Sequence, residues 1–84
     1  YPNPFNSSTN IFFTLSRPGE VEIVVYDLKG KYINRLTGAH YPSGHFSVNW
    51  DGISEDGSPV PSGLYIYELR TSNFRDISKM LLLK

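Results

Sequence analysis

The sequence predicts an all-β fold built from short antiparallel strands, and three observations support this prediction. In several segments apolar residues recur at every second position, the spacing that places them on one face of a strand. All seven glycines and all six prolines fall between these segments or in the N-terminal lead. No run of ten residues repeats its apolar positions with the period of a helix. We therefore expect six to seven short strands.

The first two expected strands form a hairpin. The run from Thr9 to Ser16 places Ile11, Phe13 and Leu15 on one face, and Arg17-Pro18-Gly19-Glu20 then holds proline and glycine where a tight turn needs them. The second strand, from Glu20 to Asp27, alternates Val21, Ile23 and Val25 with charged and apolar residues. This mixed second face predicts a strand that is partly covered on both sides.

The middle of the chain alternates more weakly. Tyr32 to Thr37 predicts a short third strand, and Gly38 to Gly44 predicts a loop because it contains Pro42 and Ser43. A fourth strand places Phe46, Val48 and Trp50 on one face. Residues 51–63 predict a long loop, because their Asp-Gly pairs and two prolines favour turns and cannot run a central ladder.

The last two strands are expected at Leu64 to Thr71 and at Phe74 to Leu83. Short strands spaced by about 8 to 14 residues, with turn signals between them, are typical of a sandwich or barrel. We favour an immunoglobulin-like antiparallel β-sandwich. Because the chain has no cysteine, the aromatic residues Trp50, Tyr65 and Tyr67 are expected to fill the space between the sheets.

Length and charge narrow the possible functions. A chain of 84 residues has room for one domain, so we predict a single domain over residues 1–84. It starts at Tyr1 without a signal peptide, and we interpret it as the C-terminal piece of a longer protein. Eight acidic and eight basic residues cancel, which argues against a nucleic-acid partner. No apolar run approaches the roughly 20 residues that span a bilayer, so no membrane span is expected.

Residues with catalytic or metal-binding chemistry are sparse. His40 and His45 have no acidic partner at a recognisable spacing, so the sequence predicts neither an enzyme nor a cofactor. Asp51, Glu55 and Asp56 are weak candidates for a calcium site, but their spacing fails the EF-hand pattern. Hydrogen bonds from nearby backbone amides in Asp-Gly turns are the better explanation for Asp51 and Asp56, and we predict no metal.

The final residues, Lys79-Met80-Leu81-Leu82-Leu83-Lys84, form an apolar run that ends in a lysine. Terminal segments usually fray unless they are tied into the fold, so this run predicts a docked or recognised end. In one interpretation Met80 and Leu82 pack into the sandwich as part of its last strand. In the other, a partner adds a strand to this edge and binds the alternate side chains, and the two interpretations are compatible on opposite faces.

Four motifs in order resemble known families over the whole chain. They are Tyr1-Pro2-Asn3-Pro4-Phe5-Asn6, Val24 to Gly30, Trp50-Asp51-Gly52 with residues 56–65, and Lys79 to Lys84. Together they resemble the C-terminal sorting domain of type IX secretion. The part from Trp50 to Tyr67 is also similar to the immunoglobulin-like domain of flagellar hook-capping proteins.

The resemblance to the sorting domain implies a noncatalytic label that directs an N-terminal cargo protein of the same chain across the outer membrane. Residues 1–8 would then be the lead-in from that cargo. The implied partners are the type IX secretion machinery and a sortase-like peptidase, and the implied location is secreted or cell-surface, reached through the periplasm. The family motif places recognition by the translocon on Gly63, Tyr65, Lys79, Met80, Leu81, Leu82, Leu83 and Lys84.

Two other functions remain open. The first is a noncatalytic carbohydrate- or protein-binding β-sandwich module, for which Tyr1, Tyr32 and Tyr41 are candidate surface platforms. The second is a structural spacer of hook-cap-like type, which would need no free C-terminus.

Overall fold

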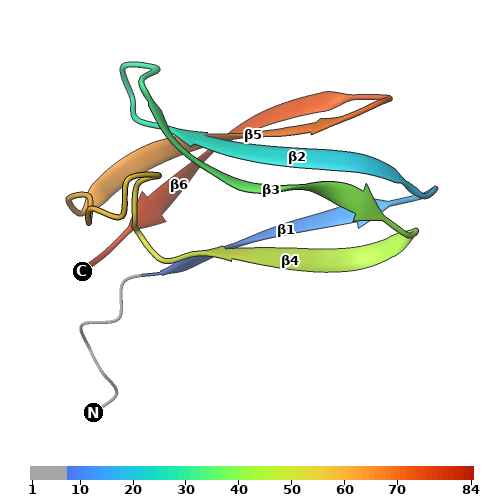
Figure 1. The fold of residues 1–84 in the computed structure, drawn as a ribbon, viewed down its shortest axis with the longest axis horizontal. Helices are drawn as coiled ribbons and strands as arrows, with labels where there is room; N and C mark the ends of the chain where they lie inside the picture. The colour runs from blue at the N-terminus through green and yellow to red at the C-terminus, as the bar shows by residue number, and fades with distance from the viewer. Residues whose placement is uncertain (1–7) are drawn as a thin grey trace, which may run out of the picture.

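The computed structural model describes residues 8–84 and confirms the all-β, immunoglobulin-like prediction. Its six strands are β1 (Thr9–Leu15), β2 (Gly19–Tyr26), β3 (Tyr32–Tyr41), β4 (Gly44–Trp50), β5 (Gly63–Thr71) and β6 (Arg75–Leu82). They form two antiparallel sheets that face each other, one with the order β1-β4 and one with the order β3-β2-β5-β6 (Figure 1). Apart from Ser8, the predicted lead-in over residues 1–8 lies outside the described residues. Between Ser8 and Lys84 no helix is long and apolar enough to cross a membrane.

The alternating apolar residues meet between the two sheets and form the core. The buried members are Ile11, Phe13, Leu15, Val21, Ile23, Val25, Trp50, Val60, Tyr65, Leu69, Met80 and Leu82. Trp50 packs edge-on against Tyr65, with their ring centroids 5.0 Å apart. Tyr67 is partly buried against the same cluster. The aromatic filling predicted for a chain without a disulfide is therefore confirmed.

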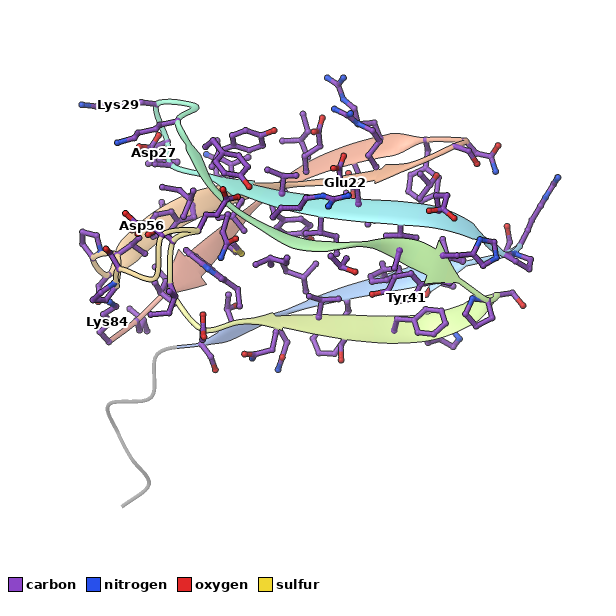
Figure 2. The ribbon with its side chains drawn as sticks, viewed as in Figure 1. Glu22, Asp27, Lys29, Tyr41, Asp56 and Lys84 are labelled. Carbon is purple, nitrogen blue, oxygen red and sulfur yellow. The ribbon has the colours of Figure 1, made fainter. Side chains whose placement is uncertain are left out.

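The third strand is longer than the sequence predicts. The expected loop from Gly38 begins only after Tyr41, because β2 provides backbone partners along this stretch, including Ala39 opposite Val21 and Tyr41 opposite Gly19. Tertiary pairing thus overrides the weak strand propensity of glycine and alanine. The extension places Tyr41 on the side of β3 that faces β4 (Figure 2). Its ring packs against Phe13 and Phe46, at centroid distances of 5.3 and 5.1 Å.

The loop predicted over residues 51–63 is confirmed up to Ser62, whereas Gly63 already pairs with Leu82 as the first residue of β5. The loop's one ladder-like contact is an isolated bridge between Ile53 and Pro59. The segment is nonetheless fixed in place by hydrogen bonds. The Trp50 indole Nε1 and the Asn34 side-chain amide both donate to the carbonyl of Ile53, each at 3.0 Å. The loop is therefore anchored to β3 and β4 at one end of the sandwich.

Candidate functional site

The apolar tail from Lys79 to Leu82 forms the second half of β6, which is an edge strand of the four-stranded sheet and pairs with β5. Successive side chains of the tail point to opposite faces of the sheet, and the two faces differ in exposure. Met80 and Leu82 are buried in the core, and Leu82 has 0 % of its surface exposed. Leu81 and Leu83 are 51 % and 65 % exposed. The prediction that Met80 and Leu82 pack into the sandwich is confirmed, and the opposite face is accessible.

Gly63 and Tyr65 lie at the start of β5, opposite the end of β6. Gly63 pairs with Leu82 and has a φ of +153°, a conformation that side chains rarely adopt. The Tyr65 ring is buried, its hydroxyl donates to the carbonyl of Pro61 at 2.6 Å, and burial raises the pKa of Tyr65. These two residues shape the strand and present little side-chain surface of their own.

The end of β6 is tied to the same junction. The backbone N–H of Lys84 donates to the Ser62 hydroxyl at 2.9 Å. Figure 2 shows Lys84 at the same end of the molecule as Asp56, in the loop between β4 and β5. Of the residues proposed for recognition, the structure therefore brings Gly63, Tyr65 and the last residues of the chain together.

The three carboxylates proposed as weak calcium ligands have different surroundings. Asp56 accepts hydrogen bonds from the Ser54 hydroxyl and the Ser58 amide, and these bonds hold its pKa below the usual value. Glu55 accepts a hydrogen bond from the Tyr32 hydroxyl, which raises the pKa of Tyr32. Asp51 is exposed. Within residues 8–84 no group of three metal-ligating side chains comes together, and the Asp-Gly turn explains Asp56.

The candidate aromatic platforms are separated. Tyr32 begins β3 and Tyr41 ends it, so the two side chains lie at opposite ends of a ten-residue strand. Tyr41 is packed between the sheets, while Tyr32 remains 43 % exposed. Tyr1 lies outside the described residues. A shared stacking surface for a sugar is therefore not formed by Tyr32 and Tyr41.

Charged side chains cross all four strands on the outer face of the larger sheet. The ion pairs run from Arg35 to Glu22 at 2.8 Å, from Glu22 to Arg70 at 3.8 Å, from Arg70 to Glu68 at 3.0 Å and from Glu68 to Arg75 at 2.8 Å. The sequence did not predict this ladder, because its members are neighbours only in the register of β2, β3, β5 and β6. His40 likewise lies 3.1 Å from Glu20 across β2 and β3.

Gly38 makes room for one end of this charge ladder. A Cβ atom at Gly38 would lie 1.8 Å from an Arg35 guanidinium nitrogen. The guanidinium therefore passes directly over the glycine on its way to Glu22. A side chain at residue 38 would therefore displace the Arg35 guanidinium from this position.

Next to the ladder lies an apolar area that we call the outer patch, defined by Leu64, Ile66, Ile77 and Leu81. Leu64 pairs with Leu81 across β5 and β6, and Lys79 pairs with Ile66 within the same area. Leu64, Ile77 and Leu81 are each about half exposed. A hollow of about 310 Å³ opens beside the patch, lined by Tyr26, Gly30, Ile66, Glu68 and Ile77. This is the largest concentration of exposed apolar side chains on β5 and β6, and it borders the free edge.

The solved structures that resemble this fold include those of two proteins, FlgD and PorU. FlgD from P. aeruginosa matches with a TM-score of 0.70 and 27 % identity, over 89 % of this chain and 59 % of that chain. Dimeric latent PorU from Porphyromonas gingivalis matches with a TM-score of 0.67 and 19 % identity, over 96 % of this chain and 8 % of that chain. At this identity the second likeness concerns the fold alone. The chain thus spans little more than half of FlgD and a small part of PorU.

Sequence comparison gives the family. No curated protein sequence matches the chain significantly. A model of the FlgD Ig-like domain matches residues 5–73, which include every strand except β6. This result agrees with the similarity to hook-capping proteins seen between Trp50 and Tyr67. The chain belongs to the FlgD Ig-like domain family.

Proposed function

We propose that this chain is a noncatalytic structural module of hook-cap-like type. The main support is that the residues of the motif between Trp50 and Tyr65 pack and form hydrogen bonds within the protein itself. Trp50 and Tyr65 pack on each other and donate to the carbonyls of Ile53 and Pro61. Asp56 is bound by residues of its own loop. The motif shared with the family therefore builds the junction between loop and sheets.

The arrangement of the strands suits such a module. β1 begins and β6 ends at the same end of the sandwich (Figure 1). Segments joined at either end would therefore leave from one side, and the sheets would remain free along their length. A module attached in this way presents its faces to neighbouring parts of an assembly.

A C-terminal extension tests this proposal. A polar extension added after Lys84 should leave the urea midpoint of residues 1–84 unchanged, because the last buried side chain is Leu82 and the Lys84 amide still reaches Ser62. Fused to a reporter with an export signal, the extended and unextended chains should reach the same compartment in a type IX-competent cell. Retention of only the extended chain in the periplasm would contradict a purely structural role.

Type IX sorting is a second candidate function, favoured by the outer face of the tail. Leu81 and Leu83 are exposed between Lys79 and Lys84, so a partner could bind them without unfolding β6. Under this proposal the type IX machinery binds the tail, a sortase-like peptidase acts afterwards, and the cargo becomes secreted or attached to the cell surface.

The test of sorting must leave the core of the sandwich intact. Deleting Met80 to Lys84 would remove two core side chains and confuse folding with recognition. We therefore propose the double variant Leu81→Ser with Leu83→Ser, which keeps Met80 and Leu82 in the core. Sorting predicts that a reporter carrying this variant accumulates in the periplasm while the unchanged tail is exported. Equal export of both reporters would exclude the tail from sorting.

A further inference from the structure

The two edges of the four-stranded sheet differ in regularity. The pairing of β3 with β2 is interrupted twice, between Ile23 and Val24 and between Val25 and Tyr26. The pairing of β6 with β5 runs through eight residue pairs without a shift, from Gly63–Leu82 to Arg70–Arg75. Bulged edges resist the addition of another strand, whereas a regular edge is open to it. β6 is therefore the edge suited to bind an extended segment.

The outer face of β6 has an unusual charge environment. Its residues are Arg75, Ile77, Lys79 and Leu81. Arg75 is already bound to Glu68 at 2.8 Å. Lys79 makes no ion pair with any residue in the described range 8–84, and its cross-strand neighbour is Ile66. Lys79 is therefore an exposed cation whose nearest neighbours on this face, Ile66, Ile77 and Leu81, are apolar.

A second copy of the chain does not complement this edge. When antiparallel strands extend one sheet, residues that lie opposite each other share a face. The outer face of β6 has no acidic residue, so a second β6 would place apolar or cationic side chains opposite Lys79. Like charges directly opposite are destabilising. The charge pattern therefore favours a different partner over self-association.

We infer that the free edge of β6 binds an extended segment of a partner protein in which apolar residues flank an acidic one. Backbone groups of the segment pair with β6, its apolar side chains cover Ile77 and Leu81, and its carboxylate pairs with the Lys79 ammonium. This mode uses main-chain hydrogen bonds for affinity and alternate side chains for specificity. It goes beyond the structural role proposed above and does not depend on type IX sorting.

The first test is a titration of the ¹⁵N-labelled chain with a short synthetic peptide. In this peptide threonine occupies every second position, and valine, glutamate and valine occupy the positions between the threonines. The glutamate therefore lies between two valines on one face of the extended peptide. We expect chemical-shift changes concentrated in the amides of β6. A control peptide with lysine in place of glutamate should bind about fivefold more weakly, the size expected for an exposed ion pair.

Charge reversal gives the matched second test. Lys79→Glu should reverse the preference, so that the lysine peptide binds about fivefold more tightly than the glutamate peptide. Lys29→Glu, in the turn between β2 and β3, changes the net charge equally and should keep the original preference. Circular dichroism should show the same thermal midpoint for Lys79→Glu and the unchanged chain, because Lys79 is exposed.

Several outcomes would overturn the inference. Equal affinity for the two peptides would remove the role of Lys79, and shift changes confined to β3 would place binding at the other edge. No shift changes with either peptide would mean that Lys79 only protects the edge against aggregation. Concentration-dependent dimers in sedimentation, with concentration-dependent shift changes in the amides of β6, would identify a second copy as the occupant.

Discussion

Two neighbouring leucines on β6 have opposite environments, because successive side chains of a strand point to opposite faces of the sheet. Leu82 has 0 % of its surface exposed and fills the core, whereas Leu81 is 51 % exposed on the outer patch. The same contrast extends across the sheet, because the inner face holds the apolar core while the outer face combines an Arg–Glu ladder with the outer patch. Packing and recognition can therefore occupy one strand without competing for the same side chains.

The largest effect is expected from exchanging these leucines for alanine. Leu82→Ala should lower the free energy of unfolding by about 2–5 kcal/mol, because it leaves a cavity in the core. Leu81→Ala should change it by less than about 0.5 kcal/mol, since that side chain is half exposed. Urea denaturation of both variants measures the difference. Similar losses in the two variants would show that the faces are not separate.

The next largest effect on stability is expected from Glu68, on the outer face of the four-stranded sheet. The Glu68 side chain is 9 % exposed, accepts a hydrogen bond from Arg70 and forms an ion pair with Arg75. Glu68→Gln should lower the free energy of unfolding by about 1.5–3 kcal/mol, the usual range for a hydrogen bond to a charged group. Glu20→Gln, which breaks an exposed pair with His40, should cost less than about 1 kcal/mol. Equal thermal midpoints for the two variants would contradict a stabilising ladder.

A smaller effect is expected at the residue opposite Leu82. Gly63→Ala should cost about 1–2 kcal/mol, because an L residue must adopt a φ of +153° there. Gly19→Ala is the matched control, since its added Cβ would meet only the Ser72 hydroxyl oxygen at 3.9 Å. Chemical denaturation compares the two. If Gly63→Ala were neutral while reporter export failed, Gly63 would act in recognition and not in backbone geometry.

The smallest effect on stability is expected from Asp56, which lies in the loop between β4 and β5 and on neither face of the sheet. Hydrogen bonds from Ser54 and Ser58 lower the pKa of Asp56 in the folded chain relative to the unfolded one. The ionised carboxylate therefore stabilises the fold above the unfolded pKa, and this contribution is lost as the pH falls through the folded pKa. Asp56→Asn should show a smaller drop in urea midpoint between pH 7 and pH 3 than the unchanged chain. An identical drop would mean that Asp56 does not contribute.

The alternation of apolar and polar residues was sufficient to predict five of the strands and the core residues that they bury. It failed at β3, where Gly38 and Ala39 have little strand propensity and only the pairing with β2 extends the strand. It also placed Met80 and Leu82 correctly on the inner face. The Arg–Glu ladder and the outer patch could not be predicted, because residues such as Glu22 and Arg70 become neighbours only through the register of distant strands.

The shared end at which β1 begins and β6 ends has a mechanical consequence. Thr9 pairs with Trp50 and Leu82 pairs with Gly63, and no ladder joins β1 to β6. Tension applied between Thr9 and Leu82 would load the outermost pair of each ladder first and peel both strands away pair by pair. Strands pulled in shear share the load among many hydrogen bonds, whereas strands peeled in this way do not. The domain would therefore yield to a small pulling force whatever its resistance to heat or urea.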